Sequence, residues 1–171
     1  MPEIAAHALN PGLRLHAVTP EYLAPLCDLF SRIQNDPASQ HFHPHPFTEE
    51  EAQRCCAHTG KDFYGIAFWG HNIVGYGMLR GWDEGYAVPS LGIYLVPEMR
   101  GKGLSKPFML LLHAEVANRG AGSVRLTVYA SNKTALGLYR SLGYVFDGEE
   151  TGKMVGRVNL AMSCGLLPVS G

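Results

Sequence analysis

The chain has 171 residues, of which 46% are hydrophobic, and its 14 Lys and Arg against 15 Asp and Glu give a formal net charge of −1 at pH 7. This composition fits one globular domain over residues 1–171. Proteins that coat nucleic acid or anionic membranes usually carry a positive excess, so the charge balance argues against both kinds of partner. Because no apolar run approaches the ~20 residues of a membrane span, we expect a cytoplasmic protein.

Two helices are the first predicted elements. Pro20–Asn35 carries apolar residues at helical spacing behind Thr19, a candidate N-cap. Thr48 and Glu51 have the spacing of a capping box, which predicts a second helix over about Glu49–His58. The segment between the helices, HFHPHPF, is rich in histidine and aromatic residues and reads as a loop.

Three strands follow these helices. Phe63–Trp69 and Asn72–Arg80 are rich in β-branched and aromatic residues and flank Gly70, so they predict an antiparallel hairpin with a tight turn. Ser90–Val96 is the third predicted strand, and it leads directly into a basic, glycine-containing turn.

The remaining elements alternate between helix and strand. A helix over Lys102–Arg119, a strand over Val124–Ala130, a short helix from Asn132 through Leu142, and closing strands over Tyr144–Phe146 and Lys153–Ser163 complete the predicted order. This order predicts a mixed α/β (α+β) domain.

The turn PEMRGKGLSKPF places basic side chains around two glycines. A strand that enters a glycine turn and then a helix gathers unpaired main-chain N–H groups at the positive end of the helix dipole, which suits a phosphate. Arg100, Lys102 and Lys106 could add charge-assisted contacts. The spacing matches neither the P-loop nor GxGxxG, so by itself it fits a solvated turn equally well.

Two blocks carry a resemblance to a known family. LGIYLVPEMRGKGLS resembles motif A of the GCN5-related N-acetyltransferase (GNAT) superfamily, [QR]-x-x-G-x-[GA], with Arg100, Gly103 and Ser105 on its defining positions. Serine stands where Gly or Ala is usual. LTVYASNKTALGLYRSLGYVF resembles the strand 5, helix 4 and strand 6 region of that family. The resemblance covers residues 90–146 and implies a central, mostly antiparallel sheet that splays apart between strands 4 and 5.

The resemblance implies acetyl-CoA as acyl donor, and no metal. Its pantetheine arm would pair with the main chain of strand 4, and its pyrophosphate would lie on the amides of the glycine turn. The implied cofactor-binding residues are Ile93, Tyr94, Leu95, Arg100, Gly101, Lys102, Gly103, Leu104, Ser105 and Asn132. For Asn132 an ordinary role as helix N-cap is equally plausible.

Tyr139 is the catalytic residue that the resemblance implies. It occupies the tyrosine of the family's ALxLYxxLGF-like block, where a phenol near the sulfur could protonate the departing thiolate. The alternative is core packing, because Leu136, Tyr139 and Leu142 lie at helical spacing. For the base, a Glu on strand 5 serves in the ribosomal branch of the family, and Thr127 stands there in this chain. Asp83 and Glu84 are further candidates for the base.

The acceptor is expected to be a primary amine of a small molecule, such as an amino sugar or a polyamine. Alternatives are a peptide or protein amine, or no transfer at all in an acetyl-CoA-binding sensor. The residues expected to contact the acceptor are Phe42, His43, His45, Trp82, Asp83 and Glu84. A metal on His41, His43 and His45 is disfavoured by the intervening prolines. A homodimer could form through the closing strands.

Overall fold

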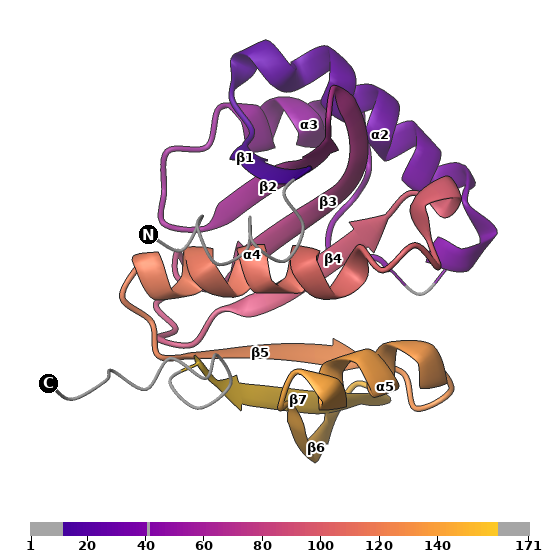
Figure 1. Ribbon diagram of the computed structural model, residues 1–171. Helices are drawn as coiled ribbons and strands as arrows, with labels where there is room; N and C mark the ends of the chain where they lie inside the picture. Colours follow the sequence, from indigo (N-terminus) through magenta and orange to yellow (C-terminus); the bar gives the residue numbers. More distant parts are fainter. Residues whose placement is uncertain (1–11, 41, 161–171) are drawn as a thin grey trace, which may run out of the picture.

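The computed structural model describes residues 12–40 and 42–160 and contains a seven-stranded mixed sheet, in the order β1-β2-β3-β4-β5-β7-β6 (Figure 1). The strands are β1 (Leu13–Ala17), β2 (Phe63–Trp69), β3 (Asn72–Arg80), β4 (Ser90–Leu95), β5 (Ser123–Val128), β6 (Val145–Glu150) and β7 (Lys153–Asn159). The helices are α2 (Leu23–Asn35), α3 (Glu49–Cys56), α4 (Ser105–Asn118) and α5 (Lys133–Ser141). The predicted mixed α/β class with its splayed sheet is confirmed.

Every neighbouring pair of strands is antiparallel except β4 and β5. These two run parallel, and the only residues paired between them are Ser90 and Arg125. Figure 1 shows β5, β7 and β6 as a lower group with α5 in front of it, and β1 to β4 as an upper group. The sheet is therefore continuous at one end of β4 and open along the rest of that strand.

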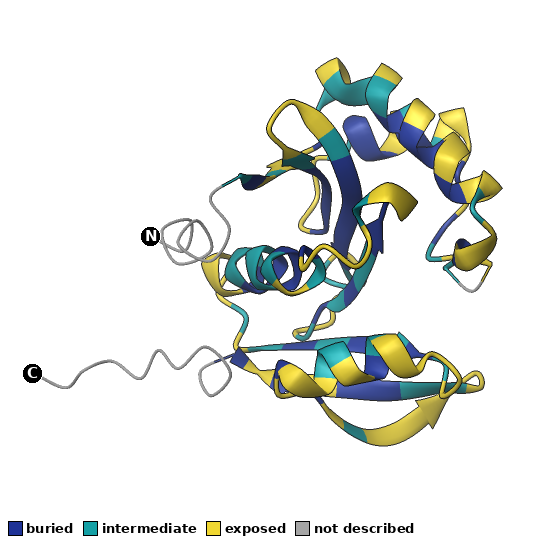
Figure 2. Ribbon diagram, turned by 45° about the vertical axis from the view of Figure 1, so that its right-hand side comes forward, coloured by how far each residue is buried: buried dark blue, intermediate teal, exposed yellow. Residues whose placement is uncertain are grey.

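Helices cover both faces of the sheet. A side chain at Gly75 would meet the Phe108 ring of α4 at 2.8 Å, and one at Gly77 would meet Leu112 at 2.9 Å, so glycine lets α4 lie close to β3. On the opposite face Tyr76 packs edge-on against Phe30 of α2. Figure 2 shows β3 largely buried between these layers, whereas the outer surface of α2 is exposed.

The predicted hairpin has the expected bounds. α3 begins at Glu49 as predicted, and its N-cap Thr48 accepts a hydrogen bond from the Glu51 amide at 3.1 Å. Thr19 does not cap: Pro20–Tyr22 forms a 3₁₀ turn and the Thr19 hydroxyl is buried without a partner among the described residues. The edge strand β1 was not predicted because its five residues are too few for a clear pattern.

The two closing strands differ from their predicted bounds. β6 continues through DGEE to Glu150, although Asp, Gly and Glu are depleted in strands, because pairing with β7 overrides that preference. β7 ends at Asn159, and residues 161–163 of the predicted strand lie outside the described residues. None of the helices in the described ranges has both the length and the apolar character needed to cross a membrane.

His113 of α4 is a titratable group inside the core. It is 2% exposed, its Nε2 lies 2.7 Å from the Tyr144 hydroxyl, and its Nδ1 has no partner among the described residues. Burial lowers the pKa of His113 to about 4. The folded chain therefore keeps this imidazole neutral at pH values where the unfolded chain, with a pKa near 6.5, takes up a proton.

We expect His113 to make the fold less stable as pH falls. Between pH 6.5 and 4 the unfolded state binds the extra proton, so the free energy of unfolding should drop by up to about 3 kcal/mol across that window. The double variant His113→Leu/Tyr144→Phe removes both partners and should flatten this slope in urea titrations. Part of the slope should remain because burial also lowers the pKa of His45. An unchanged slope in the double variant would contradict the assignment.

Candidate active site

The open edge of β4 is the first component of the site. The Val96 amide donates to the Val74 carbonyl at 2.9 Å, which fixes the antiparallel register so that alternate residues of β4, including Tyr94, bond the main chain of β3. The main-chain groups that face β5 without being paired to it belong to Ile93 and Leu95, whereas Leu91 lies beside the Ser90–Arg125 pair. Ile93 and Leu95 therefore suit the predicted contact with an extended ligand, whereas the main chain of Tyr94 is committed to β3.

The glycine turn is the second component. Gly101 and Gly103 have φ values of +72° and +75°, which only glycine adopts without strain. Among the described residues, no acceptor is bonded to the amides of residues 101–105, whereas the Arg100 amide donates to the Pro97 carbonyl at 3.2 Å. The first turn of α4 also has no side-chain cap and no acidic residue. These features together form an anion site of free N–H groups at a helix start.

The side chain of Arg100 is already paired. Its guanidinium lies 2.5 Å from the Asp36 carboxylate and 5.4 Å from the centre of the Tyr94 ring. Arg100 hydrogen-bonds Asp36 and, with the Tyr94 hydroxyl, holds the pKa of this carboxyl below its usual range. Arg100 therefore anchors the turn to the end of α2, and the exposed Lys102 and Lys106 are left as the cations at its rim.

Asn132 has the structural role that the sequence left open. Its Oδ1 accepts a hydrogen bond from the Ala135 amide at 3.2 Å and caps α5. The residue is exposed, so its amide N–H groups remain available to a ligand. Ser105 begins α4 with no hydrogen bond from its hydroxyl to another described residue.

Tyr139 of α5 lies between the core and a large cavity. Its ring packs 5.7 Å from that of Tyr144, and it also lines the cavity, so packing and access to a ligand coexist. Burial raises the pKa of Tyr139 to about 12. The phenol is therefore protonated at neutral pH and remains a hydrogen-bond donor.

The cavity has a volume of about 630 Å³, which is within the range of small-molecule sites. It lies where the sheet splays, with walls from β3, β4 and the connection between them, from β5, α5 and β7, and from the loop after α2. Of the residues predicted to contact an acceptor or act on it, the ones that line this cavity are Phe42, His43, Glu84 and Tyr139; Thr127, which stands where the ribosomal branch has its Glu base, lines it too. Tyr86 also lines it and is 64% exposed.

Three predicted acceptor contacts do not line this cavity. The Asp83 carboxylate accepts the Lys61 amide at 2.6 Å and pairs with His58 at 2.7 Å, which lowers its pKa and makes it a poor base. The Trp82 ring packs 5.6 Å from the Arg119 guanidinium. His45 is 8% exposed and belongs to the core.

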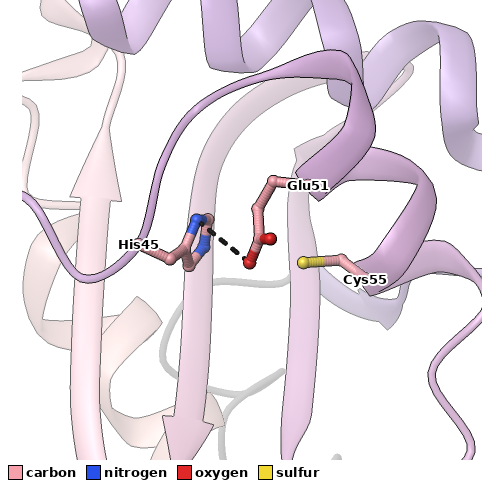
Figure 3. Close-up of side chains that lie close together, drawn as sticks. All are labelled: His45, Glu51 and Cys55. Atoms are coloured by element: carbon pink, nitrogen blue, oxygen red, sulfur yellow. Dashed lines mark ion pairs between the residues drawn. The ribbon is translucent and has the colours of Figure 1, made fainter.

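His45 belongs to a closed polar cluster with Glu51 and Cys55, whose ligand-type atoms lie within 4.8 Å of one another (Figure 3). Its Nδ1 donates to the Pro46 carbonyl at 2.6 Å and its Nε2 is 2.8 Å from the Tyr76 hydroxyl. Arg54 contacts the Glu51 carboxylate at 2.5 Å and would repel a cation there. We therefore interpret this cluster as internal hydrogen bonding that holds the loop after α2.

Comparison with known proteins decides the family. The model of the acetyltransferase (GNAT) family matches residues 27–144, which include β4, the glycine turn, α4, β5 and α5. The chain belongs to the GNAT acetyltransferase family. The predicted resemblance, which rested on residues 90–146, is confirmed, and membership extends to the helical segment before β2.

Two curated relatives are similar to this GNAT chain over part of their length. A thialysine N-epsilon-acetyltransferase of Mus musculus is 30% identical over 103 residues, which cover 52% of the chain and 61% of the relative. An uncharacterized N-acetyltransferase of Bacillus subtilis is 33% identical over 106 residues, which cover 56% of the chain and 65% of the relative. The chain thus spans less than two thirds of both relatives.

Solved structures share the GNAT fold over nearly the whole chain. A dodecameric spermidine N-acetyltransferase of Vibrio cholerae has a TM-score of 0.72 at 19% identity, and covers 91% of this chain and 98% of its own. The structure of the Vibrio cholerae enzyme with CoA and spermine has a TM-score of 0.65 at 20% identity, with 86% and 94% coverage. At this identity the likeness shows the fold alone.

The sequence reading missed most of the polar wall of the GNAT cavity. The basic side chains that line it are Arg80, Arg125, Lys153 and Arg157. One signal was present, because the odd-numbered residues of β5 face away from its buried residues Val124, Leu126 and Val128. To know which residues of β7 lie opposite those of β5, one needs the register between the two strands. This register depends on long-range pairing that the local sequence does not show.

Proposed function

We propose that the chain transfers an acetyl group from acetyl-CoA to a primary amine of a small molecule. The observation that supports this proposal is a series of main-chain hydrogen-bond donors and acceptors that have no partner among the described residues. This series runs from the free amides of residues 101–105, along the open edge at Leu95 and Ile93, to the cavity that Tyr139 lines. A pyrophosphate at the first position and a pantetheine arm along the edge would bring a thioester to the Tyr139 hydroxyl.

In the proposed reaction the neutral amine attacks the thioester carbonyl, a C–N bond forms, and the C–S bond breaks. An outward main-chain N–H of β4 would stabilise the developing oxyanion, and Tyr139 would donate a hydrogen bond to the leaving sulfur. Burial raises the pKa of Tyr139 to about 12 and would also raise the pKa of a thiol beside it. The phenol therefore remains a suitable hydrogen-bond donor to the leaving sulfur. The ammonium proton leaves to water or to Glu84, the single carboxylate among the described residues of the cavity wall.

The size of the cavity favours a small molecule over a protein segment as acceptor. It has about 630 Å³, which is the size of a small-molecule site, and the loop after α2 and Tyr86 form part of its wall. Spermidine and thialysine acetyltransferases among the relatives are consistent with a small amine as the class of acceptor.

The test is to incubate the chain with acetyl-CoA and a panel of amines and to detect products that are about 42 Da heavier by mass spectrometry, with free CoA as a second readout. We expect a product from at least one small amine, and thermal stabilisation by acetyl-CoA alone. If acetyl-CoA stabilises the fold while no small amine or peptide is acetylated, a sensor that binds acetyl-CoA replaces the proposal.

The homodimer predicted from the closing strands stays part of this proposal. β6 is a free edge of the sheet and exposes Val145, at 63% of its surface. Asp147, Glu149 and Glu150 lie on the same strand, so two copies would pair there only if these carboxylates were kept apart. Light scattering after size-exclusion chromatography, with Val145→Lys as the disrupting variant, tests the interface. A cytoplasmic location is proposed from composition alone.

A further inference from the structure

The cavity wall is basic in a chain whose formal net charge is −1. Arg80, Arg125, Lys153 and Arg157 line it, and Glu84 is the carboxylate that opposes them among the described residues. Glu150 pairs with Arg125, so the four cations meet two carboxylates and an excess of two positive charges remains. This excess creates a local positive potential, because a concave wall concentrates the field of the charges around it. A polycationic acceptor would lose its hydration there and meet repulsion.

Two of these arginines lie directly opposite each other on neighbouring strands, which is an unfavourable arrangement. Arg125 of β5 and Arg157 of β7 are direct register partners, so their side chains project from the same face. Like charges placed directly opposite destabilise a strand pair. Glu150 pairs with Arg125, whereas no carboxylate among the described residues pairs with Arg157. Local conflicts of this kind are typical of functional sites, where a ligand removes the repulsion.

The hydrogen bonds of two cavity arginines also support a ligand at this wall. Arg80 donates to the Pro44 carbonyl through Nη1, and Arg125 bonds Glu150 through Nη2. The Nε–H of each is buried and has no partner among the described residues, and these are the only two arginines in the described ranges with such an atom. Buried donors without partners cost about 1–3 kcal/mol each, so two arginines that line the cavity each contain an unsatisfied donor.

We infer that the acceptor is an amine that also carries an anionic group, a carboxylate or a phosphate, which binds at Arg125 and Arg157. This inference rests on the proposed acetyl transfer and narrows its substrate class. Planar, forked guanidinium groups match both kinds of oxyanion bidentately. Glu84 on the connection between β3 and β4 then provides the negative charge that receives the amino end. Spermidine, which is cationic along its length, is excluded as a good acceptor.

Matched acceptors test the charge directly. Glucosamine 6-phosphate is compared with glucosamine, β-alanine with β-alaninamide, and spermidine serves as the polycation. We expect kcat/KM to be at least about 10-fold higher for one anionic member over its neutral partner, and spermidine to be the poorest acceptor. The pair that responds distinguishes phosphate from carboxylate recognition.

A matched variant assigns the effect to the arginines. Arg157→Ala should reduce the anionic-to-neutral ratio of kcat/KM about 5- to 100-fold, and Arg157→Glu should invert it. Arg14→Ala is the control, since it removes the same side chain from β1 at the opposite edge of the sheet. All three variants should keep the wild-type affinity for CoA.

Three outcomes separate the two proposals. Equal or better turnover of spermidine or neutral amines, or a ratio that Arg157→Glu leaves unchanged, overturns the anionic acceptor while acetyl transfer stands. Acetyl-CoA binding without any acetylated amine overturns the proposed transfer, and the acceptor inference falls with it. An anionic-to-neutral ratio of kcat/KM that falls in Arg157→Glu but not in Arg14→Ala supports both the acetyl transfer and the anionic acceptor.

Discussion

Replacing Tyr139 with phenylalanine is expected to lower kcat for acetyl transfer about 10²- to 10⁴-fold, because an oriented proton donor at the leaving group typically contributes that much. The ring, which packs against Tyr144, stays in place, so the fold and the affinity for acetyl-CoA should remain close to those of the wild type. Pre-steady-state measurement of CoA release, together with calorimetry of acetyl-CoA binding, separates the two effects.

Tyr144→Phe is the matched control for Tyr139→Phe. It deletes a phenol hydroxyl from the adjacent ring, but this hydroxyl bonds His113 inside the core and not a ligand. The control should lose stability, on the order of 1–3 kcal/mol, and keep its chemical rate. If Tyr139→Phe retained kcat within 3-fold, Tyr139 would be a packing residue, as its helical spacing with Leu136 and Leu142 also allows.

The second large effect is expected at the glycine turn. Gly103→Val places a β-branched residue at φ +75°, where it is strongly strained, so the turn should relax and turn its amides away from a pyrophosphate. We expect the Kd for acetyl-CoA to rise at least about 10-fold. No described atom lies within 4 Å of a Cβ placed at this position, so the strain comes from the backbone conformation and not from a clash of the Cβ.

Gly120→Val provides a control with the same backbone strain at the other end of α4. Its φ is +82°, with no atom of the described residues within 4 Å of a Cβ placed there, and the variant should lose stability without losing acetyl-CoA affinity. A second arm uses acetyl-pantetheine, which lacks the pyrophosphate: Gly103→Val should affect its turnover far less than that of acetyl-CoA. Equal losses for both donors would place the phosphate elsewhere.

Local signals in the sequence were sufficient for most of the elements, though not for β1 or the bounds of the closing strands, and for the glycine turn. Gly101 and Gly103 take the positive φ that their spacing indicated, and Asn132 caps α5 through its own side chain. These features depend on a few neighbouring residues, so a short window of sequence contains the relevant information.

The cavity wall depends on contacts that a short window does not contain. His43 and His45 are two residues apart in one loop, yet His43 is exposed in the cavity wall, whereas His45 packs against Phe30 under the α2 layer. The Asp83 carboxylate accepts a hydrogen bond from the Lys61 amide, which is distant in sequence, whereas its neighbour Glu84 lines the cavity. Which member of each pair reaches the ligand is decided by tertiary packing.

The most direct test of the account is residue-resolved amide hydrogen exchange by NMR with and without saturating acetyl-CoA. The account predicts slower exchange at Ile93 and Leu95 and across residues 101–105, because these amides are open in the free chain. The Tyr94 amide, which already bonds β3, is the internal reference and should change least. Unchanged exchange at Ile93, Leu95 and residues 101–105 with acetyl-CoA bound would contradict the proposed path of the cofactor.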